Sequence, residues 1–214
     1  MRSSTPIPGN PWPHDMSITV EDRAGALLEL LWVREAYELQ PRGEDLPPLL
    51  SDTPATVQNS AVSAETRDEW ESAWPRIWHA AVAHAAQGSD LRLFDELRAT
   101  ADGSTERADL LRGMIGPNWR DDFGDSAFDD DSRSDWFQRG MDAHLAAMPK
   151  SLSAQPEHRD LPALIPAWRA GLTKVVTIPC SGEFTRRVGE NALLMTAATR
   201  EDSDSYRRAL SSFS

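Results

Sequence analysis

TKVVTIPCSGEFTRRVGENALLMTAAT, residues 173–199, is the only part of this 214-residue sequence that reads as β-strands. Residues 175–178 are all β-branched, which favours a strand over a helix. Residues 189–191, Gly-Glu-Asn, tolerate the positive φ angles that a short hairpin needs. We therefore expect a small antiparallel three-stranded meander near the C-terminus. Its strands are expected at 173–179, 184–188 and 192–199, with turns at 180–183 and 189–191.

Helices are expected on both sides of this meander, at 161–170 and 203–212, the second capped by Asp202 or Ser203. Residues 193–198 do not alternate cleanly between polar and apolar types, so both faces of the last strand are expected to be covered. In the final helix, Tyr206 and Leu210 lie four residues apart and, with Phe213, should face the sheet.

The rest of the chain reads as amphipathic helices joined by proline-rich loops. A first helix is expected over 19–39, with Thr19 as its cap, followed by a wrapping loop over 40–62. A second helix over 63–87 contains Pro75, which should kink or split it. Further helices are expected at 89–99, 104–113 and 134–147. These patterns predict an α+β fold, predominantly helical, with the meander flanked by helices.

Length and composition indicate one globular domain over 17–214, preceded by a proline-rich arm at 1–16 that is extended or disordered. Within the domain, 17–160 is expected to be the helical part and 161–214 the helix-meander-helix part. Eight tryptophans and 40% hydrophobic residues are sufficient for a sizeable core.

The formal net charge of -12 argues against binding to nucleic acid or to anionic membranes, both of which favour basic surfaces. No stretch is long and apolar enough to cross a membrane, and the N-terminus lacks the apolar segment of a signal peptide. The single cysteine excludes an internal disulfide and any multi-cysteine metal site. We expect a cytoplasmic protein.

One short motif has a possible catalytic interpretation. Cys180 and Arg186 form a C-x5-R pattern after an apolar segment, and this pattern resembles the phosphate-binding loop of the cysteine-dependent phosphatases. The resemblance implies a thiolate at Cys180 that attacks phosphorus, and an Arg186 guanidinium that holds the phosphate oxygens. Glu183 departs from it, because a carboxylate opposes an anion in the loop. The competing interpretation is a hairpin turn through 181–183, with Cys180 as a small half-buried hydrophobic residue.

An acidic segment offers a second candidate site. Seven aspartates occur between positions 121 and 135, and Asp125, Asp129 and Asp131 are candidate ligands for Ca²⁺ or Mg²⁺. The spacing does not match an EF-hand, because Ser134 falls where that loop requires glycine. The alternative is a solvated loop that leads into a helix N-terminus, where negative charge is favourable.

Histidines and tryptophans complete the candidates. His79 and His84 are five residues apart, so their side chains diverge on a helix and do not form a zinc pair. His144 or His158 could join the acidic segment in a composite site. Trp70, Trp74 and Trp78 follow at four-residue spacing, which is more typical of a core stripe than of a ligand-stacking row.

These observations favour a non-catalytic, cytosolic protein-interaction or regulatory module that binds a protein partner or a small ligand and needs no cofactor. The alternative is a small hydrolase, either phosphatase-like at Cys180 and Arg186 or metal-assisted at the Asp121–Asp135 loop. A deep cleft lined by converging acids, histidines and arginines would count against an interaction or regulatory module.

Overall fold

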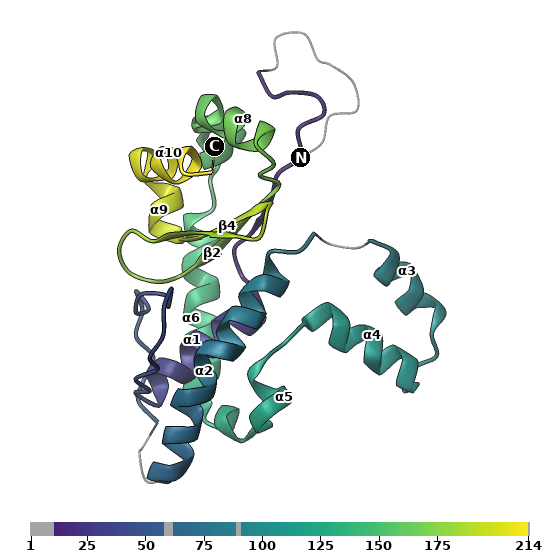
Figure 1. Cartoon of the computed structure of the whole chain (residues 1–214), viewed down its shortest axis with the longest axis vertical. Coiled ribbons are helices and arrows are strands. Elements are labelled where there is room, and N and C mark those ends of the chain that lie inside the picture. The colour runs from purple at the N-terminus through teal and green to yellow at the C-terminus, as the bar shows by residue number, and fades with distance from the viewer. Residues whose placement is uncertain (1–10, 58–61, 89–90, 214) are drawn as a thin grey trace.

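The computed structural model describes residues 11–57, 62–88 and 91–213 (Figure 1). The fold is α+β and mostly helical, with a small four-stranded mixed sheet flanked by helices. The strands are β1 (Thr19–Glu21), β2 (Lys174–Ile178), β3 (Thr185–Val188) and β4 (Ala192–Thr196), and their order in the sheet is β1-β2-β4-β3.

The expected antiparallel meander is wrong in its topology. β2 pairs in parallel with both β1 and β4, and only β3 and β4 are antiparallel. β4 therefore lies between β2 and β3, and residues 180–183 form a connection across the sheet rather than a hairpin turn. The hairpin at 189–191 is confirmed, because Val188 pairs with Ala192 and Gly189 has φ 59°. The parallel arrangement has a physical reason, since every residue of β2 and β4 is buried, as is typical of parallel strands covered on both faces.

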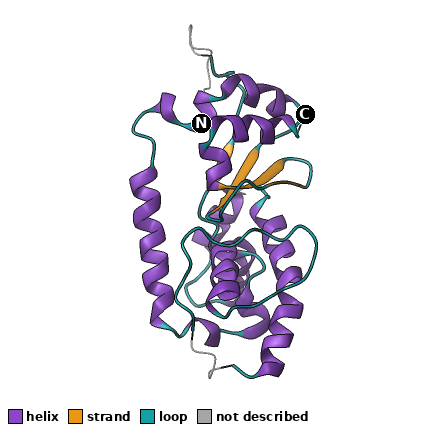
Figure 2. Ribbon diagram, turned by 90° about the vertical axis from the view of Figure 1, so that its left-hand side faces the viewer, coloured by secondary structure: helices purple, strands orange, loops and turns teal. Residues whose placement is uncertain are grey.

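Helices lie on both sides of the sheet (Figure 2), and a separate hydrophobic cluster covers each face. Val175 and Leu193 belong to the cluster formed with α8 (Leu161–Arg169) and α10 (Ser203–Ser211). Val176 and Leu194, one residue further along each strand, belong to the cluster formed with α1 (Gly25–Ala36) and α2 (Ala64–Ala85). This alternation follows the two-residue period of a strand.

The two C-terminal helices agree with the sequence prediction. Asp202 caps α10 by accepting a hydrogen bond from the Ser205 backbone N–H at 2.9 Å. Tyr206, Leu210 and Phe213 are buried in the same cluster as β2 and β4, as their spacing predicts.

The first predicted helix begins too early. Residues 19–21 form β1, α1 begins at Gly25, and the helix N-cap is Ala24 rather than Thr19. Pairing with residues 174–176 of β2 explains the difference, because a strand partner distant in the sequence overrides the local helical pattern.

Helix α2 runs without interruption through Pro75, so the predicted split does not occur. Trp70, Trp74 and Trp78 are all buried, which confirms the core interpretation of the tryptophan stripe. Trp74 and Trp78 stack with their ring centroids 5.3 Å apart. Packing of these rings along one face compensates the hydrogen bond that proline removes from a helix interior.

Six further helices complete the described part of the fold. They are α3 (Leu91–Ala99), α4 (Thr105–Ile115), α5 (Trp119–Phe123), α6 (Asp131–Ala147), α7 (Pro156–Arg159) and α9 (Ala197–Glu201), with short 3-10 turns at Ser126–Phe128 and Leu152–Ala154. α3 and α4 form an arm that extends away from the body (Figure 1). α6 begins three residues earlier than expected, because Asp130 caps it by accepting from the Ser132 N–H.

The part of the predicted N-terminal arm that the structure describes is packed on the body. Trp12 and Met16 are buried in the C-terminal cluster, and the Trp12 indole N–H donates to the Met16 carbonyl at 3.0 Å. The first ten residues of the predicted arm lie outside the described part of the chain. Within the described residues, no helix has the length and apolar character that a membrane span requires.

Candidate ligand-binding cavity

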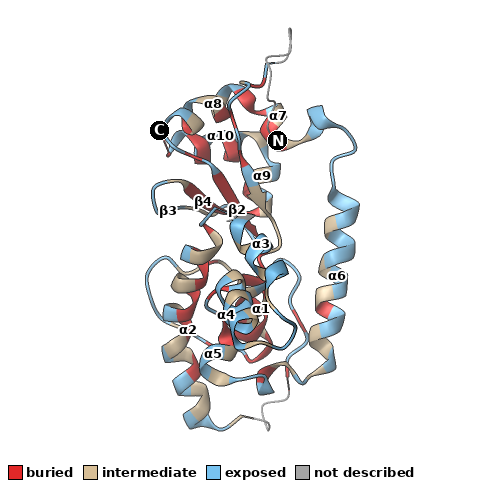
Figure 3. Ribbon diagram, turned by 90° about the vertical axis from the view of Figure 1, so that its right-hand side faces the viewer, coloured by how far each residue is buried: buried red, intermediate tan, exposed pale blue. Residues whose placement is uncertain are grey.

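A cavity of about 1000 Å³ lies between α6 and the carboxyl edge of the sheet. α6 runs along one side of the molecule and is largely exposed (Figure 3). Its inner face contributes Gly140, Ala143, His144 and Ala147 to the cavity wall. This long helix therefore closes one side of the cavity that we call the strand-end cavity.

Parallel pairing explains why the cavity forms at this edge. The carboxyl ends of parallel strands meet at one side of a sheet, and ligands of open α/β sheets bind outside those ends. Here the residues that follow each of the three parallel strands line the cavity: Asp22 and Arg23 after β1, 179–182 after β2, and Ala197 and Ala198 after β4.

Aromatic side chains provide much of the apolar wall. The Trp12 ring lies 4.7 Å from the His158 ring, measured between centroids. Trp136 and Phe137 of α6 meet edge to face at 5.1 Å, and the Trp136 indole N–H donates to the Asp52 carbonyl at 2.7 Å. These contacts fix the rings in place, which preserves an apolar surface for a bound molecule.

Two ion pairs belong to the wall. Arg139 approaches Asp52 at 3.2 Å. Arg200 donates from Nε and Nη2 to the two oxygens of Glu157, each at 2.8 Å, in a bidentate arrangement. Tyr206 also donates to Glu157, and burial together with that carboxylate raises the pKa of the Tyr206 hydroxyl well above its usual value. These pairs satisfy four of the charged side chains of the wall.

Asp22 and Arg23 differ from those four residues. Neither side chain makes a hydrogen bond or an ion pair within 4.0 Å of another described residue, and both are half-buried. Asp22 does interact electrostatically with Arg200, but the guanidinium of Arg200 is already bound by Glu157. A methyl group placed on Gly140 would lie 3.6 Å from Arg23 Nη1, so the Arg23 guanidinium lies against the middle of α6. The carboxyl end of β1 thus presents an acid and a base to the cavity.

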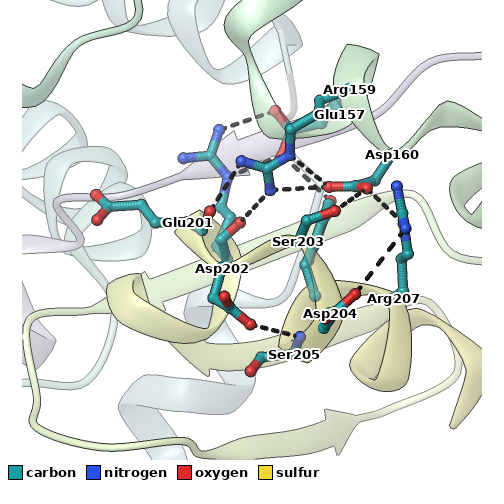
Figure 4. A network of polar contacts seen from close by, with 11 residues as sticks. Glu157, Arg159, Asp160, Glu201, Asp202, Ser203, Asp204, Ser205 and Arg207 are labelled. Atoms are coloured by element: carbon teal, nitrogen blue, oxygen red, sulfur yellow. Dashed lines mark hydrogen bonds and ion pairs between the residues drawn. The ribbon is translucent and has the colours of Figure 1, made fainter.

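A second layer of polar contacts supports the wall (Figure 4). Asp160 is fully buried and accepts hydrogen bonds from Ser203 Oγ at 2.5 Å, Arg207 Nε at 2.7 Å and Arg159 Nε at 2.8 Å. Arg159 also donates to the Glu201 carbonyl at 2.8 Å. The network joins the α7–α8 junction to α9 and α10, and so holds Glu157 and Arg200 in position.

The histidines separate into two groups. His144 and His158 both line the strand-end cavity, although the acidic segment with which either could combine is not part of its wall. Burial lowers the pKa of His158, so its ring is neutral at pH 7, and its Nε2 has no hydrogen-bond partner among the described residues. His84 lies elsewhere and contacts the Met114 carbonyl at 3.2 Å, while His79 does not line the cavity.

The structure does not bring Cys180 and Arg186 together as a phosphate-binding loop. Cys180 is buried, and burial raises the pKa of its thiol to about 12, the opposite of what a nucleophilic cysteine needs. Arg186 lies in β3, which β4 separates from β2, and its guanidinium approaches Asp45 at 3.5 Å.

The three candidate metal ligands of the acidic segment have other structural roles. Asp125 accepts a hydrogen bond from Arg120 Nε, Asp129 ends a 3-10 turn, and Asp131 opens α6, where a negative charge is favourable. Among the described residues, no cluster of three or more histidine, cysteine or acidic side chains has the arrangement of a metal site.

Sequence reasoning missed Asp22, Arg23, Glu157 and Arg200. The sequence pattern around the first two predicts an amphipathic helix, and the other two belong to short helices, α7 and α9, that lack a recognisable periodicity. No protein-family model matches the chain, and no curated protein or solved structure is significantly similar to it.

Proposed function

We propose that this protein is a non-catalytic binding module whose ligand is a small molecule held in the strand-end cavity. The observation that carries the proposal is the cavity itself. Its volume of about 1000 Å³ is at the upper end of the range of about 300–1000 Å³ that small-molecule sites occupy. Its wall combines fixed aromatic rings with a few charged groups, which is the usual composition of such sites.

A regulatory role in which the ligand controls a partner is compatible with this proposal, whereas a hydrolase is less well supported. A thiol with a pKa of about 12 is protonated at neutral pH and is therefore a poor nucleophile. Four of the acids and arginines of the wall are engaged in ion pairs with each other, which disfavours proton transfer by these four groups.

The proposal is tested by filling the cavity with a side chain. Ala143 is exposed on α6 and lines the cavity, whereas Ala146 is exposed on the same helix and does not line it. The probe is 1-anilinonaphthalene-8-sulfonate, an amphipathic fluorophore, and the readout is the indole N–H NMR signals of Trp12 and Trp136. In the wild type and in Ala146→Trp, the probe should shift both signals. Ala143→Trp should abolish the shifts, and equal shifts in both variants would contradict the proposal.

A further inference from the structure

We infer that the ligand of the strand-end cavity is a zwitterion, a molecule with an ammonium group and a carboxylate close together, as in an amino acid derivative or a short apolar peptide. This inference rests on the proposed function of the cavity. It names the class of ligand from the charged side chains of the wall that make no hydrogen bond or close ion pair within the described part of the chain.

The charge inventory of the wall supports both halves of the zwitterion. Among the described residues, seven charged side chains line the cavity, and two ion pairs, Asp52 with Arg139 and Glu157 with Arg200, account for four of them. The remaining three are Asp22, Arg23 and Glu201. A purely anionic ligand would satisfy the guanidinium but face two unpaired carboxylates. A purely cationic ligand would leave the guanidinium unsatisfied.

Partial burial should increase the contribution of these charged groups to the free energy of ligand binding. Asp22 and Arg23 are half-buried, whereas Glu201 is exposed to solvent. Partial burial of a charge costs free energy unless an opposite charge compensates it. A ligand that pairs with both Asp22 and Arg23 removes this cost twice, so these two residues, rather than Glu201, should determine the affinity.

The positions of the two residues bring an acid and a base to the same end of the cavity. Asp22 and Arg23 are consecutive, so their Cα atoms are about 3.8 Å apart, and their side chains both reach the cavity. Arg23 extends toward Gly140 of α6. A ligand whose two charges are close together can therefore reach both residues from one position in the cavity. The aromatic wall formed with Trp12, Trp136 and Phe137 then receives the apolar side chains of the ligand.

The test uses isothermal titration calorimetry with three forms of one dipeptide. Leucyl-phenylalanine has both charges, its N-acetyl form has only the carboxylate, and its C-terminal amide has only the ammonium group. The free dipeptide should bind at least about ten-fold more tightly than either capped form, since a hydrogen bond to a charged group has this effect.

Two substitutions assign the charges. Asp22→Asn should weaken the free dipeptide and the amide about ten-fold and leave the N-acetyl form unchanged. Arg23→Gln should weaken the free dipeptide and the N-acetyl form and leave the amide unchanged. Asp68→Asn and Arg169→Gln are the matched controls, because both residues are exposed and neither lines the cavity, and they should leave all three affinities unchanged.

The outcomes separate this inference from the proposed function. If the naphthalene probe occupies the cavity but the free dipeptide does not bind, or binds no more tightly than its capped forms, the zwitterion inference is overturned and the binding module stands. Affinities that are unaffected by both Asp22→Asn and Arg23→Gln overturn it as well. If neither the probe nor any dipeptide reaches the cavity, the proposed function itself is wrong. Because the comparison of capped and free dipeptides uses only the wild-type protein, it holds even if a variant fails to fold.

Discussion

Replacement of Asp160 by asparagine tests whether the buried network holds the C-terminal half of the molecule together. Asp160 is fully buried and accepts three hydrogen bonds, from Ser203, Arg159 and Arg207. Hydrogen bonds to a charged group contribute about 1.5–3 kcal/mol each when they are shielded from water. The side chain of Arg207 is 53% exposed, so its share falls toward the value of a surface ion pair, below about 1 kcal/mol.

Asparagine keeps one oxygen acceptor, so the two shielded bonds become neutral bonds that contribute about 0.5–1.5 kcal/mol each instead of being lost. Asp160→Asn should therefore lower the free energy of unfolding by about 2–3 kcal/mol at pH 7, which is the difference between the charged and the neutral bonds. For a protein of this size, such a loss corresponds to a decrease in the thermal midpoint of about 5–10 °C. Urea denaturation followed by tryptophan fluorescence provides the measurement. Asp204→Asn is the matched control, because Asp204 is exposed and its nearest arginine nitrogen is 4.0 Å away, so it should change stability by less than about 0.5 kcal/mol.

The same variant has a predicted pH dependence. Burial alone would raise the pKa of the Asp160 carboxyl, but the hydrogen bond from Ser203 and the guanidinium of Arg159 outweigh burial and hold this pKa below its usual value. The carboxyl thus titrates at lower pH in the folded chain than in the unfolded chain. Its contribution is complete above the unfolded pKa of about 3.9 and is lost as the pH falls through the folded value. The difference between wild type and Asp160→Asn should shrink from pH 7 to pH 3. A loss below about 1 kcal/mol at pH 7, or a difference that does not depend on pH, would refute this reasoning.

Three further substitutions or modifications have defined outcomes. Trp74→Ala should lower the free energy of unfolding by about 3–5 kcal/mol, because it removes a fully buried ring and its hydrogen bond to the Leu30 carbonyl. A loss of less than half this size in urea denaturation would contradict the packing of this ring. Gly140→Ala should raise the free energy of unfolding by about 0.5–1 kcal/mol, since the added methyl group touches only the end of the Arg23 side chain. A lower thermal midpoint of this variant would contradict the open space around Gly140. Cys180 should react with a thiol reagent at pH 8 only after unfolding, because it is buried with a thiol pKa of about 12; rapid labelling of the native protein would disprove this.

The sequence predicts well those parts of the fold that local patterns determine. β-branched residues place β2, and the Gly-Glu-Asn segment places the β3–β4 hairpin. Four-residue spacing places the tryptophans of α2 in the core. Each of these signals depends on neighbours within about one helical turn or one strand, so no tertiary information is needed.

The errors arise where distant segments meet. Residues 19–21 lie in an amphipathic pattern and become a strand only because β2, about 150 residues later, supplies the partner (register Thr19 with Lys174). Pro75 should interrupt a helix, yet the buried tryptophan face maintains α2. In both cases tertiary packing outweighs a local preference of a few kcal/mol at most.

One sequence pattern does indicate where the strand-end cavity lies. Residues 174–178 and 192–196 are buried at every position, and the lack of alternation in 193–196 is visible in the sequence. The predicted strand 192–199 is too long, because residues 197–199 begin α9. Such buried runs are more typical of parallel strands than of a meander, whose outer face is usually polar. Parallel pairing would have directed attention to the residues after each strand, and therefore to 179–182 and 197–198, as candidate ligand contacts. Asp22 and Arg23 could not have been found in this way, because β1 contains only three residues and its membership of the sheet depends entirely on β2. Asp22 and Arg23, the acid and the base that are proposed to bind the ligand, therefore reach the cavity because β1 pairs with β2, and no local sequence pattern predicts this pairing.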